Sequence, residues 1–315
     1  MSWPRTVAVL CGGVGGSRFL RGLAKVFENE KITAIVNTGD DIVLHGLHIS
    51  PDVDTVLYTL AGVVDDSKGW GIKGDSFGCL KAMEKLGVET WFSLGDRDIA
   101  THIFRTSLLD GGWKLSQVTK LLAEKLGVKV RVIPMTDDRI ETRIKTKGGW
   151  LHFQEYLVKR HMQDIIAGMA FAGVRDAKPA PGVIEAVTRS DLLVIPPSNP
   201  VVSVGTILSL RGVRTAVKRR KRPTVGVSPV IGGKVLRGPL AKMLRHRGVG
   251  VSSLSVARMY RGIIDGFVLD NCDATYASEL RRIGIVPHFT DILMSDVRAS
   301  AKLANETIEF SSTLA

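Results

Sequence analysis

The chain has 315 residues, of which 44% are hydrophobic and 23% charged, and its formal net charge is +12. This composition excludes a disordered chain, a collagen and a disulfide-rich miniprotein, and it allows a sizeable buried core. No apolar run approaches the roughly 20 residues of a membrane-spanning helix. The first residues also lack the apolar region of a signal peptide. We therefore expect a cytoplasmic protein with no membrane partner.

The positive charge favours anionic partners or phosphorylated substrates. Many basic residues gather at 214–222 and 242–247, which we interpret as solvated surface. No recognisable nucleic-acid-binding module accompanies them, so nucleic acid is not an expected partner. The three cysteines are widely spaced and predict neither a disulfide framework nor a structural zinc.

Strands and helices alternate along the predicted chain. Strands are expected at 6–11, 32–38, 129–135, 139–146, 149–160, 191–195, 224–227, 266–270 and about 285–293. Helices are expected at 17–27, 53–64, 78–87, 116–126 (with Ser116 as a candidate cap), 240–247 and 295–310. This alternation predicts an α/β fold with a Rossmann-like, doubly wound, mostly parallel sheet and a smaller inserted α/β region. With no low-complexity linker, we expect a single domain over 1–315 with a subdomain at about 100–190.

A glycine run follows the first predicted strand: Gly12, Gly13, Val14, Gly15 and Gly16. Glycines let backbone N–H groups approach a phosphate, and the following helix adds its positive end. The spacing fits the dinucleotide fingerprint only loosely, and the run lacks the Gly-Lys-Ser/Thr of a P-loop. A tight strand-to-helix turn without a ligand is the alternative interpretation.

Four carboxylates, Asp40, Asp41, Asp52 and Asp54, lie within fifteen residues beside a predicted strand end. Mg²⁺ prefers such oxygen ligands and usually takes one or two carboxylates plus phosphate oxygens. Asp52 can equally cap the helix that follows it. Asp41 and Asp54 are harder to explain as caps.

Polar residues also follow later strands, where a nucleotide can lie. Ser198 and Asn199 follow one apolar run, and Ser228 follows the next. Between these strands and the first two, the segment from Ser93 to Arg105 carries Asp98, Thr101, His102 and Arg105 on one face if it is helical. An ion-paired helix surface is the other explanation for this face.

Taken together, these segments resemble one family. GGVGGSR, NTGDD, HGLHISPDVDTVLYTLAG, LGDRDIATHIFRT, PMTDD, HFQEYLV, PPSNP and SPVIGG occur in this order over nearly the whole chain. The chain resembles the 2-phospho-L-lactate transferase (CofD) family of coenzyme F420 biosynthesis. The resemblance implies transfer of 2-phospholactate from lactyl-2-diphospho-5'-guanosine to the deazaflavin FO (7,8-didemethyl-8-hydroxy-5-deazariboflavin). The products are F420-0 and GMP, and the reaction requires Mg²⁺. Relatives also suggest a homodimer, and some use a phosphoenolpyruvate-derived donor that gives dehydro-F420-0.

The resemblance also implies residue roles. Asp54 and Ser93 correspond to positions that contact FO, and Asp41 and Asp54 are expected at the metal and in catalysis. The expected donor-binding residues are Gly12, Gly13, Gly15, Gly16, Ser198, Asn199 and Ser228. Asp54 is the candidate base for the attacking ribityl hydroxyl, so Asp54→Asn is expected to slow turnover at least about 100-fold. We expect it to leave stability nearly unchanged.

Two other classes of protein stay open at this point. A non-catalytic nucleotide-binding regulator of related fold shares the glycine run and the NTxDD element, but LGDRDIATHIFRT and PDVDT favour the transferase. A nicotinamide dehydrogenase needs an acidic residue for a ribose after the second strand, and Asp40 and Asp41 fit this only superficially.

Overall fold

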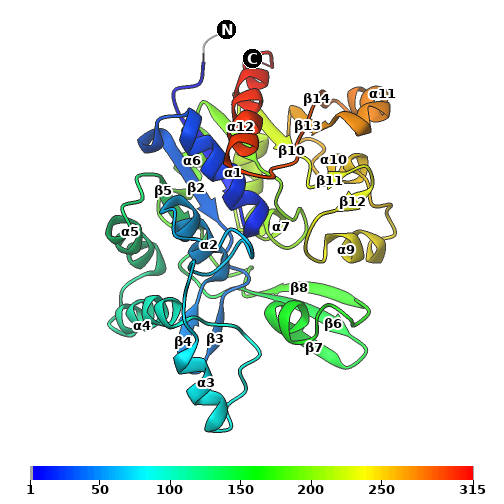
Figure 1. Ribbon diagram of the computed structural model, residues 1–315. Helices are drawn as coiled ribbons and strands as arrows, with labels where there is room; N and C mark the ends of the chain where they lie inside the picture. The colour runs from blue at the N-terminus through cyan, green and yellow to red at the C-terminus, as the bar shows by residue number, and fades with distance from the viewer. Residues whose placement is uncertain (1–2, 315) are drawn as a thin grey trace.

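A seven-stranded sheet runs through the centre of the computed structural model, which describes residues 3–314 (Figure 1). Every neighbouring pair of its strands is parallel. In spatial order the strands are β14 (Val286–Thr290), β13 (Gly266–Asp270), β10 (Thr224–Val227), β9 (Leu192–Ile195), β1 (Val7–Cys11), β2 (Ile32–Val36) and β5 (Arg131–Pro134). The expected parallel α/β sheet is confirmed.

The direction of winding reverses at β1. From β1 the chain proceeds outward through β2 to β5, and it then crosses to β9 on the other side and continues to β14. Val7 therefore pairs with Ile32 on one side and with Leu192 on the other. In an open parallel sheet, a ligand binds beyond the carboxyl ends of the strands at such a reversal. The glycine run after β1 and the Pro-Pro-Ser-Asn segment after β9 meet at this point.

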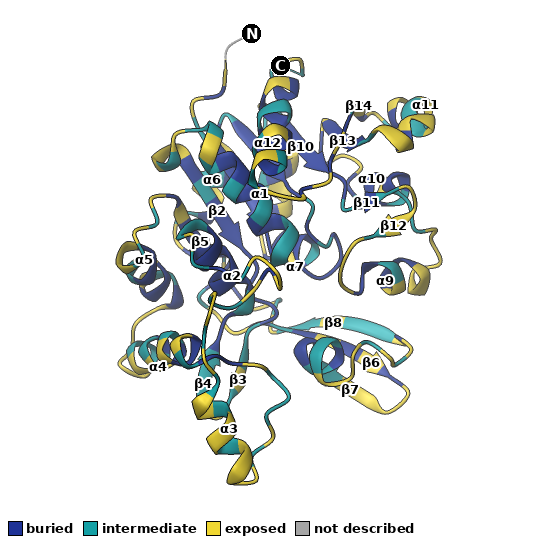
Figure 2. Cartoon of the chain, viewed as in Figure 1, coloured by how far each residue is buried: buried dark blue, intermediate teal, exposed yellow. Residues whose placement is uncertain are grey.

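Helices cover both faces of the sheet, which makes the fold doubly wound. Side chains of β1 alternate between the two resulting cores, with Val7 and Val9 in one and Ala8 and Leu10 in the other. The first core is closed by α1 (Gly13–Val26), α2 (Pro51–Leu60), α5 (Leu115–Lys125) and α12 (Val297–Ser311). The second is closed by α6 (Val183–Arg189), α7 (Val204–Ser209), α8 (Val213–Lys218), α9 (Leu240–His246), α10 (Ser253–Met259) and α11 (Ala277–Arg282). Figure 2 shows the strands buried between these layers.

Smaller elements extend from the carboxyl edge of the sheet. They comprise the hairpin β3 (Ile42–Leu44) and β4 (Leu47–Ile49), helices α3 (Gly78–Lys85) and α4 (Asp96–Asp110), the antiparallel sheet β7 (Gly149–His152), β6 (Glu141–Thr146) and β8 (Gly168–Ala172), and the hairpin β11 (Val230–Ile231) and β12 (Lys234–Val235). The proposed division into one domain with a subdomain at about 100–190 stays a prediction. Within residues 3–314, no helix is long and apolar enough to cross a membrane.

The structure corrects several local predictions. Ser116 does not cap α5, because that helix begins at Leu115 and the Ser116 hydroxyl donates to Asp137 at 2.9 Å. The helix expected at 53–64 instead begins at Pro51, whose fixed φ suits a first helical position. Helices α6, α7, α8, α10 and α11 and strand β8 were not predicted, because each is at most seven residues long, which is too short to show a period. The glycine run is helical from Gly13 onward.

Candidate functional site

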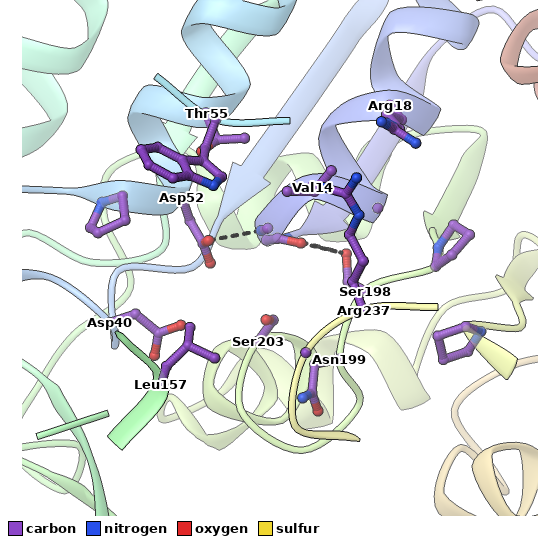
Figure 3. Close-up of a pocket in the computed structure, with 18 of the residues that line it drawn as sticks. Val14, Arg18, Asp40, Asp52, Thr55, Leu157, Ser198, Asn199, Ser203 and Arg237 are labelled. Atoms are coloured by element: carbon purple, nitrogen blue, oxygen red, sulfur yellow. Dashed lines mark hydrogen bonds between the residues drawn. The ribbon is translucent and has the colours of Figure 1, made fainter. Parts of the chain in front are cut away.

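A cavity of about 800 Å³ opens at the carboxyl edge, between the turns after β1 and β9 (Figure 3). Four buried acids line it: Asp40, Asp52, Asp54 and Asp98. Most of the predicted donor and acceptor residues line it as well, namely Gly12, Gly13, Gly15, Ser93, Ser198, Asn199 and Ser228. Gly16 and Asp41 are the two predicted site residues that are not part of its lining.

The glycine run forms the first turn of α1 and packs tightly against the segment after β9. A Cβ on Gly15 would overlap the Pro197 carbonyl oxygen, and one on Gly16 would lie 2.6 Å from Ser198 Oγ. Ser198 accepts a hydrogen bond from Gly12 N–H at 3.2 Å and donates to Gly12 O at 2.9 Å. Close packing between two loops therefore explains why residues 15 and 16 are glycines. This agrees with the alternative interpretation of the glycine run as a tight strand-to-helix turn.

The backbone N–H groups in the first turn of α1 differ in whether they are free to bind a ligand. The helix cannot bond its own first N–H groups. Gly13 N–H donates to Asp52 Oδ1 at 2.8 Å, so Asp52 lies at the amino end of a helix other than its own. The cap of α2 is Ser50 instead. The N–H groups of Val14 and Gly15, both at the cavity, have no such partner among residues 3–314.

Asp40 and Asp52 are acids held away from water and from cations. Asp52 also accepts from Asn37 Nδ2 at 2.9 Å, and burial raises its pKa to about 6. Burial, and then the charge of Asp52, raises the pKa of Asp40 well above its usual value. Asp40 Oδ1 is buried without a hydrogen-bond partner in the described chain. Both carboxylates would be stabilised by a cation in the cavity.

Asp54 belongs to a different group, which joins α2 to α4. Fully buried Arg105 donates to both carboxylate oxygens of Asp54, with Nη1 3.0 Å from Oδ2. His102 Nδ1 lies 3.1 Å from Arg105 Nη1, and its Nε2 lies 3.4 Å from Asp98 Oδ1. Tyr58 donates to Asp98 at 2.7 Å. Asp98, His102 and Arg105 of the predicted common face of α4 thus form a buried polar network, whereas Thr101 is half-buried and its hydroxyl donates to Arg97 O at 3.4 Å.

The network changes the pKa of Asp98 and brings three possible metal ligands together. Burial raises the pKa of Asp98. The hydrogen bond and the charge of His102 lower this pKa by more, so it lies below its usual value. One ligand atom each of Asp54, Asp98 and His102 lies within 4.8 Å of the other two, which is close enough to share a metal ion.

Asp41 lies behind this surface. Its Oδ2 accepts from Ser50 Oγ at 2.7 Å and lies 3.1 Å from His48 Nε2, and burial raises its pKa. The structure does not bring Asp41 into the group around Asp54. The catalytic and metal-binding roles expected for these two residues stay predictions.

The predicted polar groups after β9 and β10 are bound mainly within the protein. Asn199 Oδ1 accepts from Val201 N–H at 2.9 Å, and Ser228 Oγ donates to Val230 O at 2.8 Å. These side chains shape their turns, and they line the cavity beside the backbone groups of those turns. Ser93 also lines the cavity and lies just before α4.

Three basic residues of the cavity were missed by sequence reasoning: Arg18, Lys68 and Arg237. Arg18 follows Val14 by one turn of helix, so helical spacing from the glycine run could have indicated it. Lys68 and Arg237 lie in irregular segments, where no periodic signal exists.

Comparison with known proteins identifies the relatives of this site. A family model described as "2-phospho-L-lactate transferase CofD" matches residues 7–304. The chain belongs to the CofD family. A CofD relative from Streptomyces griseus, named phosphoenolpyruvate transferase, is 44% identical over 309 residues, covering 96% of this chain and 97% of the relative. A 2-phospho-L-lactate transferase from Methanosarcina acetivorans is 39% identical over 296 residues, covering 94% and 96%.

Membership of the CofD family makes this chain a transferase of coenzyme F420 biosynthesis. A crystal structure of a upf0052-family protein from Bacillus halodurans has a TM-score of 0.63 and 18% identity, covering 98% of this chain and 99% of that one. This second likeness shows a shared fold alone. The family model, by contrast, confirms the resemblance to the CofD family.

Proposed function

We propose that this enzyme transfers a phosphorylated three-carbon acid from a guanosine diphosphate donor to FO. The observation that carries the proposal is one cavity that combines free helix amides, basic side chains, buried acids and an apolar wall. Each feature matches one part of the two substrates. The donor is an anionic diphosphate, and FO is a flat ring that bears a ribityl hydroxyl.

The donor side of the cavity is the amino end of α1. The N–H groups of Val14 and Gly15 are the proposed contacts of the diphosphate, and the positive end of a 14-residue helix favours negative charge there. Gly12 and Gly13 let the backbone approach the diphosphate. The turns at Ser198, Asn199 and Ser228 enclose the nucleoside. Gly16 supports this turn from behind by its contact with Ser198.

The acceptor side contains the aromatic and aliphatic residues that a deazaflavin ring needs. They are Ile49, Tyr58, Trp70, Phe92, Phe153 and Leu157. Apolar surface of this kind buries a flat ring, while a few polar groups fix its orientation. Ser93 and Asp54 lie among these residues and supply a hydroxyl and a carboxylate for FO.

In the proposed reaction, the ribityl hydroxyl oxygen attacks the phosphorus that bears the three-carbon acid. The new P–O bond forms as the bond from that phosphorus to GMP breaks, and the hydroxyl proton moves to a carboxylate. Two Arg105 N–H groups hold Asp54 in place, so Asp54 can orient the hydroxyl and accept its proton. Phosphoryl transfer depends mainly on such positioning and on charge neutralisation.

Mg²⁺ is the metal that the reaction implies, and residues of the cavity fit it. Asp40 has a buried oxygen without a partner and adjoins Asp52, and neither acid forms an ion pair within the described residues. Asp54, by contrast, already has the cation of Arg105. We therefore propose that Asp40 and Asp52 hold Mg²⁺, in addition to the candidate ligands Asp41 and Asp54 that were predicted from the sequence. When bound, Mg²⁺ would neutralise diphosphate charge.

The transferred acid is proposed to be the enolpyruvyl group. Relatives named phosphoenolpyruvate transferase share 44% and 42% identity with this chain, against 39% and 37% for two named 2-phospho-L-lactate transferases. The product would then be dehydro-F420-0. Phospholactate, the group first expected, is the second candidate.

Mass analysis of products tests this proposal. The chain is incubated with FO, Mg²⁺ and either guanosine-linked donor, and the two products differ by two hydrogens. Dehydro-F420-0 formed in preference to F420-0 supports the enolpyruvyl donor, and the reverse supports phospholactate. Nucleotide binding with neither product would instead favour the regulator. The homodimer and the cytoplasmic location stay predictions for separate measurement.

A further inference from the structure

Two arginines from distant parts of the chain meet at the cavity. Arg18 belongs to α1, and Arg237 lies between β12 and α9. Figure 3 draws both on the side of Val14 and Ser198, across the cavity from Asp40. Burial, and then the charge of Arg237, lowers the pKa of Arg18, as expected of two cations held close together.

Neither arginine has a carboxylate partner among residues 3–314. Within the described chain, Arg18 donates only to the backbone oxygens of Met294 and Asp66, at 3.3 and 3.4 Å. Arg237 donates to the backbone oxygens of Ser67 and Lys68. Each guanidinium has five N–H groups, so most of them remain available. Two like charges in this position would be stabilised by an anion.

A neighbour on the same helix shows the contrast. Arg21 is close to Arg18 in sequence, yet its Nη1 lies 2.6 Å from Asp66 Oδ1. Arg21 does not line the cavity. The arginine that faces away from the cavity is therefore paired with an acid, and the two that face it are not.

The pair also adjoins the free amides of α1. A Cβ placed on Gly69 would lie 2.6 Å from Val14 Cγ1 and 3.5 Å from Arg237 Nη1. Arg237 and the segment around Gly69 thus lie against the first turn of α1. Val14, Gly15, Arg18 and Arg237 all line the same cavity, so an oxyanion at the two amides would lie on the side of the cavity that holds both guanidinium groups.

We infer that Arg18 and Arg237 bind the phosphate that remains with the nucleotide when the donor is cleaved, an inference that rests on the proposed function. In-line displacement places the attacking and leaving oxygens on opposite sides of the phosphorus. Figure 3 draws Asp40 and Asp52 across the cavity from both arginines, so the arginines lie away from the acidic end of the cavity. When the P–O bond breaks, its electron pair stays on the leaving phosphate, and arginine N–H groups stabilise that added charge.

The test measures binding of GMP and of guanosine to the full chain by calorimetry, over a series of salt concentrations. Arg237→Gln and Arg18→Gln should each weaken GMP binding roughly 10- to 100-fold, flatten its salt dependence and leave guanosine binding unchanged. Arg237→Lys should recover part of the GMP affinity. The control Arg21→Gln, on the same helix, should bind GMP within about twofold of the wild type.

Unchanged GMP affinity in both glutamine variants would overturn the inference, as would an equal loss of guanosine binding. A raised KM for the complete donor with normal GMP binding would place the arginines on the acid's carboxylate and also refute it. If the wild type binds neither GMP nor guanosine, the proposed nucleotide is wrong. Inorganic pyrophosphate then serves as the probe: binding that Arg237→Gln abolishes supports the anion site, and no binding by the wild type refutes it.

Discussion

The backbone N–H of Gly13 lies 2.8 Å from Asp52 Oδ1, which connects the amino end of α1 to the first turn of α2. A carboxylate of the protein thus accepts a hydrogen bond from one of the N–H groups that a glycine run is expected to offer to a phosphate. For the proposed donor, the next two amides along the helix remain. The same contact holds Asp52 in the cavity beside Asp40, where its charge adds to an acidic end opposite the arginines.

Asp54→Asn should reduce turnover by about 10²–10⁴-fold, because it removes the charge that we propose orients the ribityl hydroxyl and accepts its proton. The expectation of nearly unchanged stability is revised, because Asp54 pairs with the fully buried Arg105. Breaking a buried pair costs about 3–5 kcal/mol. Thermal melts beside steady-state product formation test both effects.

The double variant Asp54→Asn with Arg105→Met is the control, since it removes the unpaired charge as well. It should melt above Asp54→Asn alone and remain inactive. Near-normal turnover in either folded variant would remove Asp54 from the mechanism.

Gly15→Ala should lower the free energy of unfolding by about 1–3 kcal/mol, because its Cβ would overlap the Pro197 carbonyl oxygen. Gly250→Ala is the matched control, since nothing lies within 4 Å of a Cβ at that exposed position. Chemical denaturation measures both variants. Equal stability of the two would show that the turn relaxes easily and that close packing is not the reason for Gly15.

Removal of Mg²⁺ by EDTA should abolish product formation, and added Mg²⁺ should restore it. Calorimetric titration with Mg²⁺ then separates the candidate ligands independently of activity. Asp40→Asn should weaken Mg²⁺ binding at least about tenfold, because it removes a carboxylate that has no cation of its own. The predicted ligand Asp41 is compared through Asp41→Asn. Loss of Mg²⁺ binding only in Asp41→Asn would contradict the assignment to Asp40.

Stability should respond to pH through Asp52, whose folded-state pKa is raised to about 6 from the usual 3.8. The folded state therefore binds more protons than the unfolded state between these values, so Asp52 contributes a loss of stability as pH rises from about 4 to 6. In Asp52→Asn this contribution is absent. The melting temperature of the wild type minus that of Asp52→Asn should therefore fall as pH rises through this range, and parallel curves would contradict the buried, ionising Asp52.

Local pattern alone determined much of this protein. The strand before the glycine run, the helix after it and the common face of Asp98, His102 and Arg105 follow from periods of two and 3.6 residues, which depend only on near neighbours. The carboxyl edge of a parallel sheet as the place of the site follows from the alternation of strands and helices. Short helices such as α7 and α8 have too few residues for such a pattern.

Tertiary structure decided which of these residues meet. Arg105 pairs with Asp54, Gly13 with Asp52, and Arg18 lies beside Arg237, and each partner comes from a different element. A further contact, between Gly12 and Ser198, depends on the reversal of strand order at β1, which places the turns after β1 and β9 together. Whether an acid holds a metal, a helix amide or an arginine is set by the neighbours that folding supplies, because burial makes each unpaired charge costly.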